Sequence, residues 1–190
     1  AAFASGSGSA TLNFDYKVKL RAQSSDLDYV TTNSLALNSA TIKVAAGDNA
    51  TLTLPAPGAT GSLGASKAIV IDGTPPTVSS TSPADNQSDV SVASTIAVTF
   101  SEAMDNVTTN TSNTTCSGTF QVSSDSFSSC VQMSSSPSVS NTNKIFTFDP
   151  NSNLSTGTVY LIRITTGVSD GSGNNMSSQY QTGTGFTTSK

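Results

Sequence analysis

The stretch Ile96-Ala97-Val98-Thr99-Phe100 places a large apolar side chain at every second position, with a small or polar residue between. Successive side chains of a β-strand point to opposite faces of the sheet, so Ile96, Val98 and Phe100 share one face. A strand with one apolar face has to bury that face against a second layer of structure. The stretch therefore predicts a β-strand in a layered protein.

The same alternation recurs along the chain, and turn-forming clusters of Gly, Pro, Asn, Asp and Ser separate its occurrences. The other strand candidates are residues 12–18, 42–44, 52–54, 67–71, 120–122, 146–148 and 160–164. The turn signals lie at 46–49, 55–58, 82–86, 149–151 and 170–174. Short strands separated by such turns predict an all-β fold of the sandwich type. No segment has a convincing helical period.

The composition favours strands and turns over helices. Only 11% of the residues are charged, against roughly 25% in an average soluble domain. Ser and Thr together make up about a third of the chain. Ser, Thr and Asn side chains compete for backbone hydrogen bonds and so disfavour helix interiors. Eleven of the twelve acidic residues are Asp, a loop and cap residue, and one is Glu.

Charge and residue content exclude several classes of function. The net charge is −4, with eight Lys and Arg residues, so we expect no nucleic-acid partner, since phosphate binding needs clustered cations. No apolar run reaches the ~18–20 residues of a membrane span. The chain has no His, which excludes Ser-His-Asp and Cys-His catalysis within it. The carboxylate pairs Asp26 with Asp28 and Glu102 with Asp105 lack the apolar setting that raises a catalytic pKa. We therefore expect no enzymatic activity and no required cofactor.

Two cysteines, Cys116 and Cys130, are separated by thirteen residues. Their neighbours are Ser, Gly and Thr, and no His is present to complete a zinc site with them. The pattern favours a disulfide that closes a small loop over two free thiols. A disulfide indicates an oxidising, extracellular compartment.

The clearest domain boundary is the Pro-rich stretch 72–77. Two consecutive prolines remove ladder donors and stiffen the backbone, which suits a linker. We therefore expect a first unit over 1–71, a linker over 72–77 and a second unit over 78–190. The second unit is long enough for a complete sandwich. The first has four strand candidates, whereas an immunoglobulin-like sandwich has about seven.

Residues 75–188 resemble the bacterial Ig-like domain found in S-layer and other surface proteins. The matching stretches are 75–78 (PPTV), 82–85 (SPAD), 96–105 (IAVTFSEAMD), 158–160 (TVY), 167–174 (GVSDGSGN) and 186–188 (FTT). The segment from about 106 to 140, which contains both cysteines, departs from the shorter family pattern. We interpret it as an elaborated strand pair or loop.

Residues 5–72 resemble the C-terminal part of an Ig-like repeat of large bacterial surface adhesins. The matching stretches are 5–16 (SGSGSATLNFDY), 26–29 (DLDY), 35–38 (LALN) and 69–72 (IVID). Several strands normally precede the first of these stretches in such repeats, and here they are missing. The fold class expected from both resemblances is a tandem of immunoglobulin-like β-sandwiches, the first one incomplete.

The incomplete first unit leaves three hypotheses open. The chain can be a piece of a longer protein, it can borrow a strand from another subunit, or its first unit can form a smaller compact sandwich. Head-to-tail strand borrowing does not close on itself and produces a filament. The partners expected are accordingly copies of the chain or adjacent Ig-like repeats, and a host or surface receptor as an adhesion target.

Calcium is the one ligand for which the sequence offers suitable residues. Asp72 lies at the domain junction, and Asp26 and Asp28 lie in a loop that can approach it. Calcium binds six to eight oxygens, and the adhesins that the chain resembles often carry calcium at junctions. The alternative is that these are ordinary turn and capping aspartates.

These observations predict a non-enzymatic, extracellular Ig-like segment of a bacterial surface adhesin or stalk. The alternative is the subunit of an extracellular filament or pilus assembled by β-strand complementation of the first unit.

Overall fold

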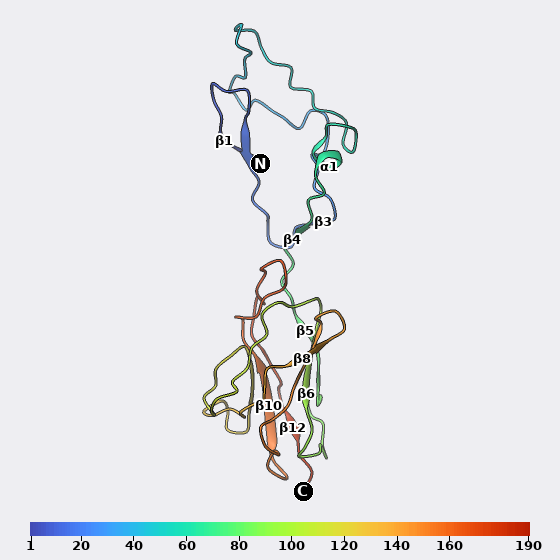
Figure 1. The fold of residues 1–190 in the computed structure, drawn as a ribbon, viewed down its shortest axis with the longest axis vertical. Helices are drawn as coiled ribbons and strands as arrows, with labels where there is room; N and C mark the ends of the chain where they lie inside the picture. Colours follow the sequence, from blue (N-terminus) through green and yellow to red (C-terminus); the bar gives the residue numbers. More distant parts are fainter. The chain divides into compact units, whose positions relative to one another are not determined.

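The computed structural model describes residues 1–190 and divides into two compact units, Ala1–Thr74 and Pro75–Lys190. Both units are built from antiparallel β-strands, and the helix α1 (Leu63–Ser66) is a single turn (Figure 1). Ser62 caps α1, since its hydroxyl accepts a hydrogen bond from the backbone N–H of Ala65 at 3.1 Å. The all-β class expected from the sequence is confirmed.

Unit 2, Pro75–Lys190, contains eight strands in two four-stranded sheets. The first sheet has the order β5 (Val78–Ser82), β6 (Ile96–Phe100), β9 (Ile145–Phe148) and β8 (Ser138–Ser140). The second is built on β10 (Val159–Ile164), which pairs with β7 (Phe120–Ser123), β11 (Tyr180–Gln181) and β12 (Phe186–Thr187). All pairings between these strands are antiparallel.

The core of unit 2 follows from the alternation in its strands. Ile96, Val98 and Phe100 are buried while the residues between them are half-buried, as the period of two requires. The register pairs Val98 with Phe146 across β6 and β9. The rings of Phe120 and Phe148 stack between the two sheets. All eighteen residues of the hydrophobic core cluster belong to this unit.

Unit 1, Ala1–Thr74, has much less regular structure. β1 (Ala2–Ser5) pairs with β2 (Asn13–Asp15), and β3 (Gln23–Ser24) pairs with β4 (Ile71–Asp72). Each pairing forms a separate two-stranded sheet. No large hydrophobic side chain of this unit is among the buried ones. Two-stranded sheets are only marginally stable without a further layer to pack against.

Two strand candidates of unit 1 do not form strands. Residues 42–44 contribute only an isolated bridge between Lys43 and Asn49, and residues 52–54 lie outside regular structure. A strand exists only where a partner strand satisfies its N–H and C=O groups. Unit 1 supplies too few partners, so apolar alternation alone does not produce a ladder there.

Candidate functional site

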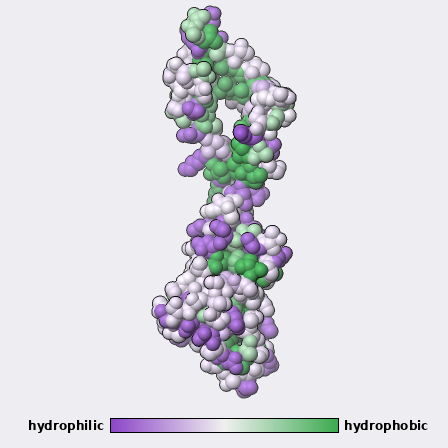
Figure 2. Space-filling model, viewed as in Figure 1, coloured by the Kyte–Doolittle hydropathy of each residue, from purple (hydrophilic) through white to green (hydrophobic).

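An apolar groove lies in unit 1 between the β1–β2 hairpin (residues 2–15) and segment 35–45. The groove has a volume of about 860 Å³. Phe3 and Phe14 contribute to one wall, and Leu37, Ile42 and Val44 contribute to the other. In the space-filling view, hydrophobic residues gather beside an opening in this unit (Figure 2).

The side chains that line the groove remain in contact with solvent. The rings of Phe3 and Phe14 meet edge to face with their centroids 6.0 Å apart, yet they are 54% and 43% exposed. On the opposite wall Val44 is 49% exposed. Full burial of one such side chain is worth about 1.5–3 kcal/mol. Any segment that covers the groove therefore gains binding energy from several side chains at once.

Exposed apolar residues are concentrated in unit 1. Of the twelve large hydrophobic side chains that stay exposed, ten lie in this unit. They are Phe3, Phe14, Tyr16, Val18, Leu20, Val30, Leu37, Val44, Leu63 and Val70. Unit 2 exposes only Val139 and Val159. Four of the ten, Phe3, Phe14, Leu37 and Val44, line the groove together, and an exposed apolar patch of this kind is typical of an interaction surface.

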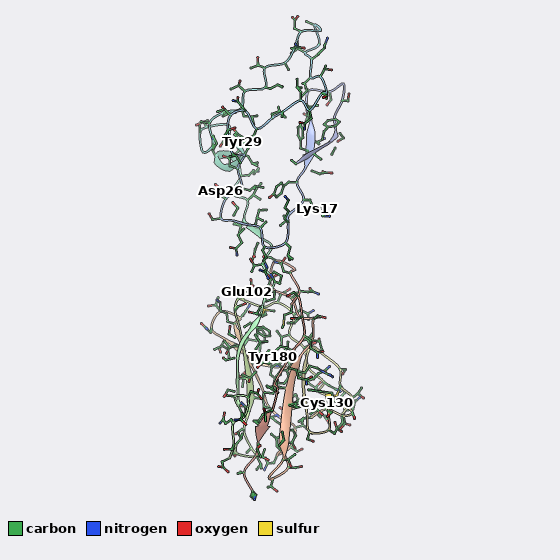
Figure 3. All side chains as sticks on the ribbon, turned by 180° about the vertical axis from the view of Figure 1, so that it is seen from behind. Lys17, Asp26, Tyr29, Glu102, Cys130 and Tyr180 are labelled. Carbon is green, nitrogen blue, oxygen red and sulfur yellow. A yellow bond between two sulfur atoms is a disulfide. The ribbon has the colours of Figure 1, made fainter.

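The span 16–20 follows the hairpin and has no regular structure. Tyr16, Val18 and Leu20 alternate with two lysines, and Leu20 is 74% exposed. The backbone groups of Lys17 and Val18 form none of the hydrogen bonds between segments. Lys17 projects from the opposite side of unit 1 to Asp26 and Tyr29 (Figure 3). The span is thus an irregular linker that ends in a turn, where the carbonyl of Lys19 accepts a hydrogen bond from the N–H of Ala22 at 2.9 Å.

The structure brings together two of the three predicted calcium ligands. A methyl group in place of the Gly64 hydrogen would lie 3.0 Å from Oδ2 of Asp28 and 3.3 Å from Oδ2 of Asp26, so both carboxylates flank α1. Asp72 lies in β4, and its Oδ1 accepts a hydrogen bond from the N–H of Thr74 at 3.0 Å. The carboxylate oxygens of the three residues do not all come within 4.8 Å of one another.

The carboxylate of Asp28 is held by donors of the protein itself. It accepts hydrogen bonds from the N–H of Tyr29 at 2.8 Å and of Gly58 at 3.0 Å. Burial raises the pKa of Asp28, but these two N–H groups, together with Ser62 and Gly64, outweigh it and lower the pKa overall. Donors in these positions compete with a cation for the same oxygens. Calcium binding at Asp26, Asp28 and Asp72 stays a prediction.

Cys116 and Cys130 form a disulfide, with their Cα atoms 5.0 Å apart. It joins the loop that precedes β7 to the loop that follows it, and Cys130 lies at the side of the sandwich in Figure 3. The backbone N–H of Cys130 also donates to the carbonyl of Thr114 at 2.7 Å. We refer to residues 116–130 as the cystine segment.

Arg163 on β10 fixes the cystine segment from the outer face of the second sheet. Its guanidinium carbon lies 3.8 Å from the centre of the Phe127 ring. Its Nε donates to Oε1 of Gln121 at 2.8 Å, and its Nη2 donates to the same oxygen. Gln121 in turn donates to the carbonyl of Gly118 at 3.1 Å. Arg163 thus links β10 to Phe127 and Gln121 of the cystine segment directly, and to Gly118 of the same segment through Gln121.

The comparison with protein families decides what this sandwich is. Residues 72–188, more than half of the chain, match the family described as the bacterial Ig-like domain. The chain belongs to this family. The resemblance expected over 75–188 is therefore confirmed.

Solved structures with a likeness to this Ig-like chain come from a bacterial surface layer protein, SbsC. Its domains 1–6 are 20% identical with a TM-score of 0.41, and the match covers 61% of this chain and 14% of that one. The structure of rSbsC(31–844) is 21% identical, with the same TM-score and coverage. The N-terminal part of SbsC is 19% identical with a TM-score of 0.41, covering 61% of this chain and 24% of that one.

The Ig-like chain therefore spans only a small part of the length of those proteins, between 14% and 24%. No curated protein matches it. The structure contains no helix that is both long enough and apolar enough to cross a membrane.

The family stretch 82–85 has a clear structural role in the Ig-like domain. The carboxylate of Asp85 accepts hydrogen bonds from the N–H groups of Gly183 at 2.9 Å, Thr184 at 3.0 Å and Gly185 at 2.6 Å. Burial raises the pKa of Asp85, but these N–H groups outweigh it and lower the pKa. Asp85 thereby fixes the turn between β11 and β12 to the loop after β5.

Sequence reasoning missed the second wall of the groove and the contacts of Arg163. Within segment 35–45 the sequence shows the resemblance of residues 35–38 to an Ig-like repeat and the apolar alternation of residues 42–44, and neither predicts a groove. The alternation of Tyr16, Val18 and Leu20 with Lys17 and Lys19 is a further available signal. The stacking of Arg163 on Phe127 has no local signal, because the two residues are far apart in the sequence.

Proposed function

We propose that this chain is a non-enzymatic, extracellular segment of a bacterial surface protein, in which Ig-like units serve as a spacer or stalk that presents an adhesive end. The observation that carries the proposal is the match of residues 72–188 to the bacterial Ig-like domain family. A closely packed sandwich with a disulfide suits a mechanical role outside the cell. The absence of His from the sequence is in keeping with it.

Surface location is tested with antibodies against the chain on intact cells of the bacterium that produces it. We expect staining without permeabilisation and loss of that staining after brief treatment with proteinase K. An antibody to a cytosolic protein is the control for intact cells. Staining that requires permeabilisation would contradict the proposal.

The adhesive part of the proposal needs its own test. Purified full-length chain, labelled with a dye, is incubated with host cells and with the producing bacterium. Saturable binding that unlabelled chain competes away supports an adhesin with a host or surface receptor. Binding that rises linearly with the concentration of labelled chain, and that unlabelled chain does not compete away, would support a spacer role without adhesion.

A second candidate function is that of a subunit in an extracellular filament or pilus assembled by β-strand complementation. The open apolar groove of unit 1 favours it, because a strand added there would cover the exposed side chains that line it, Phe3, Phe14, Leu37 and Val44. Sedimentation velocity across a range of concentrations, with negative-stain microscopy, tests the idea. A single monomeric species at every concentration, and no fibres, would rule it out.

A further inference from the structure

We propose that residues 16–21 of unit 1 attach the chain to a lipid surface that carries anionic phosphate headgroups. Their sequence, YKVKLR, alternates three aromatic or aliphatic side chains with three cations, and we refer to them as the basic segment. The inference goes beyond the proposed function, since a spacer or stalk needs no lipid contact of its own.

The first observation is the concentration of positive charge in the basic segment. It holds three of the eight Lys and Arg residues of the chain within five positions, and Asp15 is the nearest acidic residue in the sequence. Unit 1 as a whole has five cations and five Asp residues, whereas unit 2 has three cations and seven acidic residues. The net charge of −4 thus belongs to unit 2, so an anionic surface is repelled less by unit 1.

The three cations are available to an external partner. Lys17, Lys19 and Arg21 are all exposed, and their side chains take part in no hydrogen bond or ion pair of the structure. Lys17 projects from the opposite side of unit 1 to Asp26 (Figure 3). Such a cation gives up no contact within the protein when it donates a charge-assisted hydrogen bond to a phosphate oxygen.

The second observation is that the residues between the cations are large, apolar and exposed. Tyr16 is 49% exposed, Val18 41% and Leu20 74%, and none of them lines the groove of unit 1. Tyrosine is enriched at the boundary between lipid and water, and apolar burial there adds to electrostatic attraction. A soluble polyanion would leave these side chains in water. A lipid surface therefore fits the basic segment better.

The conformation of the basic segment lets both sets of side chains reach one surface. In a paired strand, neighbouring side chains would point to opposite faces. Residues 16–19 have no regular structure, and the backbone of Lys17 and Val18 is not hydrogen-bonded to another segment. The segment ends in a turn, where the N–H of Arg21 donates to the carbonyl of Gly73 at 2.6 Å. The long stems of Lys and Arg also let their charged ends return to the headgroups while neighbouring side chains reach deeper.

The charge and the apolar side chains have to act together. Three cations are fewer than the roughly four to eight of a polybasic lipid-binding cluster, and each raises binding to an anionic surface about fivefold. Stable anchoring at a lipid surface takes two signals rather than one. We therefore expect reversible binding that needs both features of the basic segment.

Vesicle flotation of the full chain tests the inference. One set of vesicles is pure phosphatidylcholine, and the other contains equal parts of phosphatidylcholine and phosphatidylglycerol. We expect binding to the anionic vesicles to exceed binding to the neutral ones by about tenfold or more, and to weaken as added salt screens the charges. Equal binding to both kinds of vesicle, or binding to neither, overturns the inference.

Two triple variants with the same net charge locate the contact. The first removes the cations of the basic segment through Lys17→Gln, Lys19→Gln and Arg21→Gln. The matched control removes three other exposed cations through Lys43→Gln, Lys67→Gln and Lys190→Gln. The first variant should bind anionic vesicles no better than neutral ones, whereas the control should keep most of the preference. Equal loss in both would mean that only net charge matters, which contradicts the assignment.

Apolar variants separate a lipid surface from a soluble polyanion. Val18→Ser with Leu20→Ser keeps every cation and should lower binding to anionic vesicles severalfold. Val30→Ser with Val70→Ser, at positions 88% and 71% exposed, is the matched control and should bind like the natural chain. If the first variant also binds like the natural chain, or if the natural chain binds soluble polyphosphate more tightly than vesicles, the segment recognises phosphate alone. Either result overturns the assignment to a lipid surface.

A tryptophan reporter gives a second readout. The chain has no Trp, so Leu20→Trp contributes its only indole. Emission from this variant should shift to shorter wavelength when anionic vesicles are added and not when neutral ones are. Val139→Trp, at a 47% exposed position of unit 2, is the control and should show no shift. A shift at both positions, or at neither, would contradict contact through the basic segment.

Discussion

The rings of Phe120 and Phe148 stack with their centroids 3.5 Å apart and their planes 3° apart, and this contact joins the two sheets of unit 2. Phe120 belongs to β7 and Phe148 to β9, and Phe148 is fully buried. The contact therefore holds the sandwich together between its layers rather than along one sheet.

Replacement of Phe148 by Ala should lower the free energy of unfolding of unit 2 by about 3–5 kcal/mol, since it removes a buried ring and leaves a cavity. Phe148→Leu should cost less, because it retains part of the volume. Urea denaturation of the full chain, followed by circular dichroism, measures both. Phe3→Ala, at a 54% exposed position of unit 1, is the control and should leave the unit 2 transition unchanged. An equal effect at the two sites would refute the layered core.

The strand alternation made this core predictable. Ile96, Val98 and Phe100 were expected on one face, and β6 buries all three. The edge strands were harder to foresee, because β11 and β12 are two residues long and carry too few side chains for a period. Their positions depend on tertiary contacts such as those of Asp85 with the turn between them.

The candidate site was less predictable than the core, again for a physical reason. The small number of strands in unit 1 could be inferred by counting, and the structure has two two-stranded sheets there. The groove could not, because its walls come from residues 2–15 and 35–45, which only the folded chain brings together. The donors to Asp28 illustrate the same limit, since Gly58 lies thirty positions away.

Loss of the disulfide should destabilise unit 2. Cys116 and Cys130 are 14 positions apart, and closing a loop of this size contributes about 3 kcal/mol in the chain-entropy model. The double variant Cys116→Ser with Cys130→Ser should therefore unfold at lower temperature. Reductant should lower the melting temperature of the natural chain and leave that of the variant unchanged. If the double variant had the same melting temperature as the oxidised natural chain, the disulfide would contribute nothing to stability.

Arg163 should stabilise the cystine segment through the shape of its guanidinium group as well as through its positive charge. Arg163→Ala removes the contact with Phe127 and both hydrogen bonds to Gln121, at an expected cost of about 1–2 kcal/mol. Arg163→Lys should recover only part, since an ammonium cannot place two donors on one oxygen while stacking on a ring. Hydrogen exchange should quicken in residues 116–130 of both variants. Full recovery by Lys would mean that only the positive charge matters.

Acid should destabilise unit 2 through Asp125. The hydroxyl of Ser129, its backbone N–H and the hydroxyl of Ser123 lower the pKa of Asp125 from 3.8 to about 2. A lowered folded-state pKa gives stability that is complete above pH 3.8 and is lost as the pH falls toward 2. Asp125→Asn should therefore show a smaller fall in melting temperature between these pH values. Asp89→Asn, an exposed residue outside this network, is the matched control. Identical pH profiles for the natural chain and Asp125→Asn would contradict the assignment.

Calcium binding at Asp26, Asp28 and Asp72 can be decided by a melting experiment on the full chain. If calcium binds the folded chain, its addition raises the melting temperature by mass action, and a chelator reverses the rise. Asp26→Asn should then weaken the effect, because it removes a carboxylate beside Gly64 while leaving the donors to Asp28 in place. Magnesium at the same concentration is the control for ionic strength, since it retains its waters and prefers a smaller, octahedral site.

The hydrogen bonds that Asp28 accepts from the N–H groups of Gly58 and Tyr29 support the opposing hypothesis. In that hypothesis Asp28 is a structural residue that closes the loop before α1. In that case neither calcium nor chelator shifts the transition, whereas Asp28→Asn alone lowers it.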